Sequence, residues 1–282
     1  MASVAFLGTG LLGAAMVEGM LRRGDTVTVW NRTEAKARAL ETLGATVAAT
    51  PGDAAAAADC VHMTLPDDEV VDRIISAVTP RLRKGALVID HTTASPRGTK
   101  TRVARLNSAG VKFLHAPVFM SPQMAKDAIG IMLVSGPNAV FEEARGALEM
   151  MTGEVWYLGE QGDLAAAYKI FGNSMLFVIA AGVADVFAMA KGLGIPPADA
   201  LTVFSKFQPG GLIKARGDKM ARGDFSASFE LTMARKDMRL MLEAAAGQPM
   251  AVLPSIARAM DEAIAKGHGQ DDLGAIAAEV VR

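Results

Sequence analysis

The spacing of hydrophobic and polar positions changes near residue 162 of this chain. Before that point, short apolar runs alternate with segments of helical character, whereas every later segment has helical character. The apolar runs predict strands at Ser3–Leu7, Thr26–Trp30, Thr46–Ala48, Cys60–Leu65, Ala86–Asp90, Lys112–His115, Ile131–Ser135 and Glu154–Leu158. Strands that alternate with helices are typical of a doubly wound, mostly parallel sheet. The pattern therefore predicts an α/β fold, with a Rossmann-type domain over residues 1–161 and an all-helical domain over residues 162–282.

Proline and glycine mark where the predicted helices begin and end. In the first domain, the helical segments are Ala14–Arg23, a segment that opens at Pro66-Asp67-Asp68, a segment that ends at Ser108, and Ala139–Met151. In the second domain, breaks at Gly192–Gly194 and Pro209-Gly210-Gly211 separate the helices. The later helices are predicted at Leu231–Ala246, Leu253–Lys266 and Asp272–Val281.

One long helix, Asp163–Lys191, is predicted to join the two domains. It contains no proline, and Asp163 can cap its first turn. At about 1.5 Å per residue it would span roughly 40 Å. Nearly every position is apolar, so we expect protein to cover it on most sides. A membrane span is the alternative, but Lys169, Asn173 and Asp185 interrupt the ~20 apolar residues that a bilayer requires.

Lys169 and Asn173 are four residues apart and therefore share one face of this helix. A lysine in an apolar helix costs free energy unless it is paired or has a function. The alternative is a side chain that reaches solvent with its ammonium group.

A glycine-rich loop, Gly8-Thr9-Gly10-Leu11-Leu12-Gly13, lies between the first strand and the first helix. This strand–turn–helix context predicts a dinucleotide-binding site, in which the helix N-terminus offers amide donors to phosphate. The alternative is a glycine turn with only a structural role. Loops that follow other parallel strands also bind such ligands, which indicates Leu65-Pro66 and Thr92-Thr93.

The second strand ends in Asn31-Arg32-Thr33, where an NAD-preferring site normally carries an acid for the ribose 2′-hydroxyl. The next carboxylate is Glu34. Arg32 offers a planar charged group for a 2′-phosphate, and Thr33 adds a hydroxyl. The sequence therefore favours NADP(H) as cofactor, with an exposed turn arginine as the alternative.

Composition narrows the class of protein. Lys and Arg number 29 against 30 Asp and Glu, so no basic surplus favours nucleic acid or an anionic membrane as partner. The single Cys60 allows no internal disulfide and favours the cytoplasm. Residues 2–7 lead into the glycine loop without a basic leader, so we expect no export signal. The spacing of His62, His91, His115 and His268 fits no metal motif.

Over its whole length the chain resembles the β-hydroxyacid dehydrogenases, the family of the 3-hydroxyisobutyrate, tartronate semialdehyde and succinic semialdehyde enzymes. The resemblance lies in Phe6–Gly13, although the family's usual Met after the central glycines is Leu here, and in Leu65-Pro66-Asp67, Asp90-His91-Thr92-Thr93, the Lys169–Asn173 spacing and Lys236-Asp237. The resemblance implies an NADP-dependent oxidoreductase in which Lys169 is catalytic, Asn173 supports it and binds substrate, and Lys236 reaches the nicotinamide end of the cofactor.

This assignment fits the chemistry of a lysine. Hydride transfer to a carbonyl leaves an alkoxide that must take a proton, and an ammonium group can supply it. The ordinary pKa of lysine is ~10.4, so burial and nearby positive charge would bring it closer to neutral pH. Lys236 and an oxidised nicotinamide would be sources of that charge.

The predicted substrate loop departs from the family. Where the family usually reads Asp-Ala-Pro-Val-Ser-Gly-Gly, this chain has His115-Ala116-Pro117-Val118-Phe119-Met120-Ser121. Phe119 and Met120 replace a hydroxyl and a glycine that serve a substrate carboxylate. We therefore expect larger or less charged carbonyl substrates, bound by His115, Pro117, Val118, Phe119, Met120, Ser121 and Asn173.

Two related chemistries fit less well. Gly172 stands where 6-phosphogluconate dehydrogenases carry His, which argues against decarboxylation. Imine reductases of similar fold generally lack the lysine. An imine or ketone reductase with an altered loop remains an alternative, as does a non-catalytic NADP-binding sensor or scaffold. Because the helical part is too apolar to be covered alone, we expect a homodimer or homotetramer.

Overall fold

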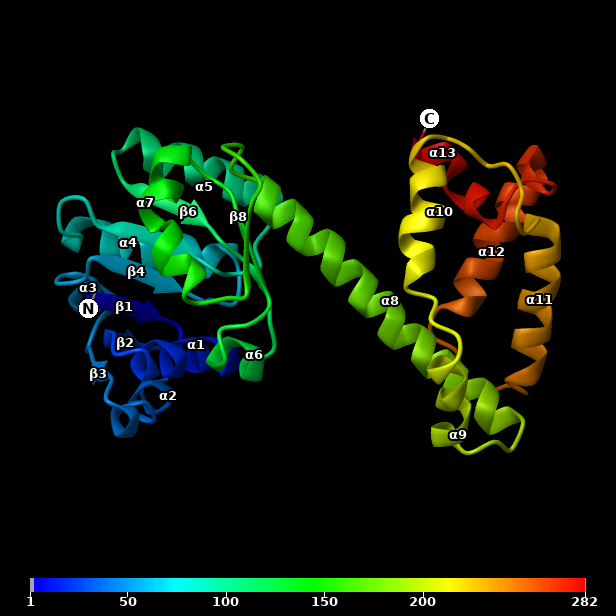
Figure 1. Cartoon of the computed structure of the whole chain (residues 1–282), viewed down its shortest axis with the longest axis horizontal. Coiled ribbons are helices and arrows are strands. Elements are labelled where there is room, and N and C mark those ends of the chain that lie inside the picture. The colour runs from blue at the N-terminus through cyan, green and yellow to red at the C-terminus, as the bar shows by residue number, and fades with distance from the viewer. Residues whose placement is uncertain (1–2, 282) are drawn as a thin grey trace. The chain divides into compact units, whose positions relative to one another are not determined.

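The computed structural model describes residues 3–281, and contacts within the chain divide it into two compact units. The first unit ends at Asn173 and the second begins at Ser174, so the boundary lies inside the long helix α8 (Leu164–Gly192) (Figure 1). The predicted fold class is confirmed: a Rossmann-type sheet, one long helix and a helical C-terminal part.

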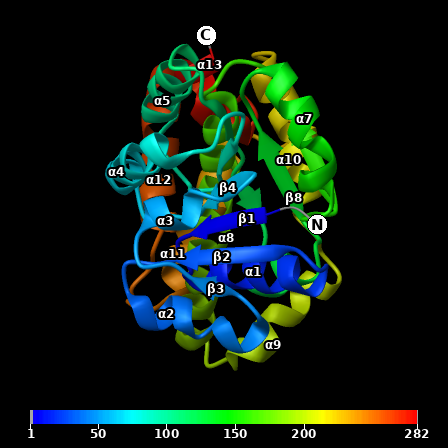
Figure 2. The same ribbon diagram turned by 90° about the vertical axis from the view of Figure 1, so that its left-hand side faces the viewer.

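Within the described residues, six parallel strands form the main sheet of the first unit in the order β3-β2-β1-β4-β5-β6. The strands are β1 (Ser3–Leu7), β2 (Thr26–Trp30), β3 (Thr46–Val47), β4 (Cys60–Met63), β5 (Leu87–Asp90) and β6 (Lys112–His115). Figure 2 shows β1 between β2 and β4, where the strand order reverses. In register, Leu7 at the end of β1 pairs with Trp30 and with Met63. The loops that follow these three strands therefore meet at one edge of the sheet.

The core of this unit lies on both faces of the sheet, because successive side chains of a strand point to opposite faces. On β1, Val4 and Phe6 belong to one buried cluster, while Ala5 and Leu7 belong to another. The helices that accompany the sheet are α1 (Leu11–Arg22), α2 (Glu34–Arg38), α3 (Pro51–Ala55), α4 (Asp68–Val78), α5 (Pro96–Ser108), α6 (Pro122–Lys126) and α7 (Asn138–Glu149).

The last strands of the first unit form a separate sheet rather than extending the parallel one. Here β7 (Val118–Phe119) pairs antiparallel with β8 (Ile131–Val134), which pairs parallel with β9 (Glu154–Tyr157). The sequence predicted β8 and β9 but not β7, a pair of residues too short to show a periodic pattern. An isolated antiparallel bridge between His115 and Ser135 links the two sheets.

The second unit continues α8 with α9 (Pro197–Leu201), α10 (Gly211–Ala221), α11 (Leu231–Ala244), α12 (Leu253–Ala263) and α13 (Ala278–Val281). Its described core contains Leu231 and Met238 of α11 and Met260 of α12. Asp185 of α8 is buried and accepts backbone N–H bonds from Ala251, Val252 and Leu253 at the start of α12. This carboxylate therefore provides acceptors for backbone N–H groups at the N-terminus of α12, which have no partner within the helix.

The prediction that protein covers the long helix on most sides is wrong for the single chain. Leu176 is 56% exposed and Phe177 is 71% exposed. By length and composition α8 is long and apolar enough to cross a membrane. The sequence pattern reports only that the positions are apolar, and it does not report whether this chain or another partner covers them.

Candidate active site

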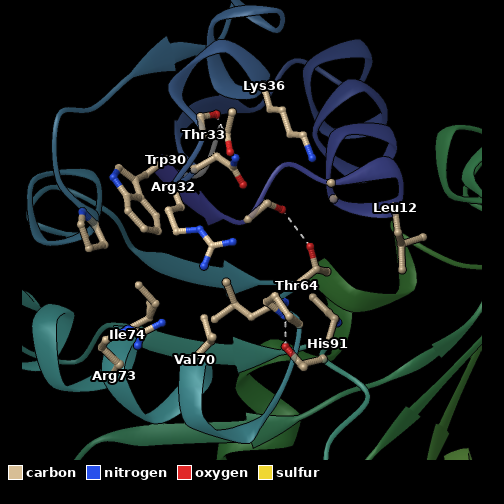
Figure 3. Close-up of a pocket in the computed structure, with 18 of the residues that line it drawn as sticks. Leu12, Trp30, Arg32, Thr33, Lys36, Thr64, Val70, Arg73, Ile74 and His91 are labelled. Atoms are coloured by element: carbon tan, nitrogen blue, oxygen red, sulfur yellow. Dashed lines mark hydrogen bonds between the residues drawn. The ribbon is translucent and has the colours of Figure 1, made fainter.

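A cavity of about 910 Å³ opens at the edge of the sheet where β1, β2, β4 and β5 end (Figure 3). Of the predicted cofactor residues, its lining includes Gly8, Gly10, Leu11, Leu12, Gly13, Asn31, Arg32, Thr33, Leu65, Pro66 and Thr93. Thr9 is not in this lining; it is buried, and its N–H donates to Asn31 Oδ1. Lys236 belongs to α11 of the second unit, where its ammonium lies 2.5 Å from the Asp237 carboxylate, and its role at the nicotinamide stays a prediction.

The glycine loop has the shape that a pyrophosphate needs. Gly8 has φ of 97°, and a Cβ there would lie 2.1 Å from the Thr64 carbonyl oxygen. A Cβ at Gly13 would lie 2.0 Å from the Gly8 carbonyl oxygen, so both positions require glycine. At Gly10, by contrast, no described atom would lie within 4 Å of a Cβ. The loop is therefore closed toward the protein and open toward the cavity.

The N-terminus of α1 faces this opening. The helix starts at Leu11, earlier than predicted, and no side chain among the described residues caps it. Its first turn contains no acid. The N–H groups of such a turn are ready donors for phosphate oxygens, and the helix dipole favours the negative charge. The residues present fit a dinucleotide pyrophosphate.

Basic side chains gather around the loop after β2. Arg32 and Lys36 are directed into the cavity, and Arg73 of α4 also lines it (Figure 3). Asn31 shapes this loop, because its Oδ1 accepts from Thr9 N–H and its Nδ2 donates to the Thr33 carbonyl over 2.9 Å. Sequence reasoning missed Lys36 and Arg73. The signal for Lys36 was its place in the first turn of the helix that follows this loop, because the start of such a helix lies beside the loop.

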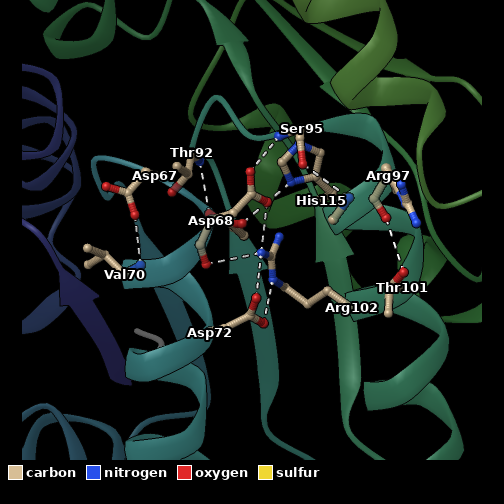
Figure 4. A network of polar contacts seen from close by, with 12 residues as sticks. Asp67, Asp68, Val70, Asp72, Thr92, Ser95, Arg97, Thr101, Arg102 and His115 are labelled. Carbon is tan, nitrogen blue, oxygen red and sulfur yellow. Dashed lines mark hydrogen bonds and ion pairs between the residues drawn. The ribbon is translucent and has the colours of Figure 1, made fainter.

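Polar contacts hold the loops after β4 and β5 together. Leu65 N–H donates to Thr92 Oγ1 over 2.9 Å, and Ser95 N–H donates to Asp68 Oδ2 over 2.8 Å. The fully buried Arg102 of α5 pairs with Asp68 at 2.9 Å and with Asp72 at 3.0 Å (Figure 4). These pairs fix the two loops that border the cavity beyond the glycine loop.

A buried chain of hydrogen bonds ends at the cavity. His91 Nδ1 lies 2.7 Å from the Ala116 carbonyl, His62 Nδ1 lies 2.9 Å from His91 Nε2, and Cys60 Sγ lies 3.2 Å from His62 Nε2. A carbonyl only accepts, so His91 Nδ1 carries its proton. With neutral rings, His62 then donates to His91, and Cys60 donates to His62.

The surroundings of Cys60, His62 and His91 keep these three side chains uncharged. Burial lowers the pKa of His91 to about 4 and lowers that of His62 well below its ordinary value, with the neighbouring ring adding to the effect at His62. Burial also raises the pKa of the Cys60 thiol. Because all three groups stay uncharged, the ring of His91 is held in one tautomer at the wall of the cavity. The sequence alone assigned no such role to Cys60 or His62.

Lys169 lies on α8 and is buried, with 9% of its surface exposed. Burial lowers the pKa of its ammonium. Its Nζ lies 4.1 Å from the centre of the Phe119 ring. Asn173 follows one helical turn later on the same helix face and is half-buried.

Most residues of the predicted substrate loop pack in the core or cap a helix, and one of them lies beside Lys169. His115 is fully buried, with Nδ1 3.5 Å from Asp90 Oδ2, and Val118 packs in the core. The buried Pro117 accepts from Leu133 N–H through its carbonyl, and Ser121 caps α6. Met120 packs partly against the core, so Phe119 is the loop side chain that the structure brings to Lys169. Substrate contact by these residues stays a prediction.

A cavity at the reversal of strand order with a glycine loop at its edge is typical of the class of dinucleotide-binding domains. Lys169 is not among the described residues that line this cavity. Among residues 3–281, no group of three His, Cys, Asp or Glu side chains is placed to hold a metal ion.

Comparison with known proteins gives the family. Residues 3–159 match the family model described as the NAD-binding domain of 6-phosphogluconate dehydrogenase. Residues 164–280 match the model described as NAD-binding of NADP-dependent 3-hydroxyisobutyrate dehydrogenase. The chain therefore belongs to the family of NAD(P)-dependent oxidoreductases that these two models describe, and the resemblance is confirmed.

Two kinds of curated relative are similar to the chain. The chloroplastic glyoxylate/succinic semialdehyde reductase 2 of Arabidopsis thaliana is 29% identical over 280 residues, which are 96% of this chain and 76% of that protein. The cytokine-like nuclear factor N-PAC of Anopheles gambiae is 26% identical over 277 residues, which are 96% of this chain. The match spans 49% of that N-PAC, so the chain is about half the length of this relative.

Solved structures show the same fold. An imine reductase from Myxococcus stipitatus in complex with NADP+ has a TM-score of 0.90 at 24% identity, covering 97% of this chain and 98% of that one. A reductive aminase from Aspergillus terreus in complex with NADPH and ethyl levulinate has a TM-score of 0.90 at 24% identity, with full coverage of both chains. Structural homologues thus bind NADP+ or NADPH.

Proposed function

We propose that this protein is an NADP-dependent reductase that transfers a hydride between the nicotinamide and a small hydroxy or carbonyl compound of the 3-hydroxyacid or semialdehyde type. The single observation that carries the proposal is the burial of Lys169 on α8, one helical turn before Asn173. A buried lysine without an acid partner is costly, and such groups cluster at functional sites.

The cofactor would be held by the groups around the cavity. The open side of the glycine loop and the N-terminus of α1 would take the pyrophosphate, and Arg32, Thr33 and Lys36 would take the 2′-phosphate. When bound, NADP(H) supplies or accepts the hydride.

Lys169 would supply the proton. As a carbonyl carbon is reduced, negative charge develops on its oxygen, and the Lys169 ammonium donates a proton to that oxygen. The lowered pKa of Lys169 favours this donation near neutral pH. The Asn173 amide would bind the same oxygen or the ammonium without adding charge.

The lysine favours a carbonyl substrate over an imine. Hydride addition to a protonated imine gives a neutral amine and requires no further proton, whereas addition to a carbonyl gives an alkoxide that does. The likeness to imine reductases concerns the fold, and it keeps imines in the test as the second candidate.

The deciding experiment follows NADPH absorbance with purified protein against aldehydes, keto acids, ketones and preformed imines. Turnover of a carbonyl compound supports the proposal. Turnover confined to imines would replace it with imine reduction. Tight NADPH binding without turnover of any compound would favour the sensor or scaffold function instead.

A further inference from the structure

The ring of Phe119 is fitted between a lysine and a glycine of one helix. Phe119 ends β7, and its ring centre lies 4.1 Å from Lys169 Nζ. A Cβ at Gly172 would lie 2.3 Å from Phe119 Cζ and 2.7 Å from Cε1. The ring therefore rests on α8 where a side chain is missing, three residues after the lysine, and any larger residue there would displace it.

The ring is also the group that stabilises the buried charge. Within residues 3–281, the Lys169 ammonium has no described hydrogen bond or ion pair, and its cation–π contact is with Phe119. Desolvation is the cause that shifts its pKa, with no charged neighbour contributing. The carboxylate of Asp163, just before α8, is paired with another lysine: its Oδ2 lies 3.9 Å from Lys100 Nζ. A cation over an aromatic face is attracted by the ring, and more strongly when both are desolvated.

We propose that Phe119 is a positioning residue for Lys169: its ring, seated on Gly172, holds the ammonium where an anionic partner would otherwise hold it. The proposal rests on the proposed role of Lys169 as proton donor.

The test compares Phe119→Leu, Gly172→Ala and the double variant. Leucine keeps the surroundings apolar but removes the aromatic face and the Cζ atom that the new alanine would meet. Each single variant should lower kcat about tenfold and leave the Kd for NADPH unchanged. The apparent pKa of the Lys169 limb in the pH profile of kcat should fall in both, because the charged lysine loses its stabilising partner.

The double variant tests whether Gly172 acts by giving the Phe119 ring room to pack on α8. If Gly172 acts through the ring, adding Gly172→Ala to Phe119→Leu should cause no further loss. Gly146→Ala on α7 is the matched control, because no described atom would lie within 4 Å of its Cβ, and it should not alter kcat. If Gly172→Ala alone fails to fold, recovery of folded, NADPH-binding protein in the double variant supports the packing of the Phe119 ring on Gly172.

The outcomes separate this proposal from the proposed function. If Lys169→Ala abolishes turnover while both single variants keep the kcat and pH profile of the natural protein, the positioning role of Phe119 is wrong and the reductase stands. Additive losses in the double variant would also overturn it. If Lys169→Ala leaves turnover intact, the proposed function fails first.

Discussion

Arg32 and Lys36 line the same cavity, one from the loop before α2 and the other from within that helix. Two cations at this place provide more positive charge than a ribose hydroxyl needs, and they match a 2′-phosphate. Arg38 of the same helix pairs instead with Glu34 and Glu41, outside the cavity lining.

NADPH should therefore bind at least about tenfold more tightly than NADH, a difference of about 1.4 kcal/mol. Arg32→Ala and Lys36→Ala should each weaken NADPH binding and leave NADH binding nearly unchanged. Isothermal titration with both cofactors measures this, with Arg38→Ala as the control. Equal affinities for the two cofactors in the natural protein would contradict the prediction.

Lys169→Ala should lower kcat on the order of 10²-fold or more, because a general acid is lost, while the Kd for NADPH stays nearly the same. Steady-state kinetics and cofactor titration measure the two effects separately. Lys84→Ala, at an exposed position, is the control for loss of a positive charge. A Lys169→Ala variant with near-normal turnover would remove this residue from the mechanism.

The substrate loop gives a prediction about specificity. Short acids such as glyoxylate or tartronate semialdehyde should be poor substrates, because burying a carboxylate against Phe119 and Met120 without donors costs several kcal/mol. Phe119→Ser combined with Met120→Gly should shift the ratio of kcat/KM values toward these acids. If the natural protein turns over a two- to four-carbon semialdehyde acid best, the carboxylate is held in another way.

The exposed apolar face of α8 predicts self-association. Leu176, Phe177 and Ile179 are exposed in the single chain, and contiguous apolar surface of this kind marks an interface. Light scattering at micromolar concentration should show at least a dimer, and Phe177→Asp should shift the protein toward the monomer. A natural protein that is monomeric would refute the prediction, and one that requires detergent for extraction would indicate a membrane partner for α8.

Acid should destabilise the fold through the buried histidines. The pKa of His91 is about 4 in the fold against 6.5 ordinarily, so below pH 6.5 the unfolded chain binds a proton that the folded chain does not. The contribution of His91 to the free energy of unfolding is fully present above pH 6.5. It falls by about 1.4 kcal/mol per pH unit as the pH decreases toward 4. His62 acts in the same direction.

Urea unfolding at pH 7 and pH 5 should therefore show a loss of about 2 kcal/mol from His91, with His62 adding to the loss. A His62→Asn/His91→Asn variant should be less stable at pH 7, because the hydrogen-bonded chain is lost, and should depend less on pH. A natural protein that is equally stable at both pH values would contradict this account.

The sequence by itself determined the local elements and the cofactor loop. The predicted bounds of β1, β2 and β6 are those of the structure, because apolar runs between turn residues limit a strand from both sides. The glycine loop was assigned from its strand–turn–helix context, and the structure adds that Gly8 and Gly13 have no room for a Cβ. Lys169 was singled out because a charge in an apolar helix is costly wherever that helix lies.

Only the tertiary structure decided which distant residues meet. The chain from Cys60 through His62 to His91 joins two neighbouring strands, Arg73 reaches the cavity from α4, and Phe119 meets Lys169 about fifty residues further along. A periodic pattern records whether a position is apolar, and it carries no information about its partner. The exposure of α8 shows the same limit, since hydrophobicity predicts that a face will be covered but does not specify which surface covers it.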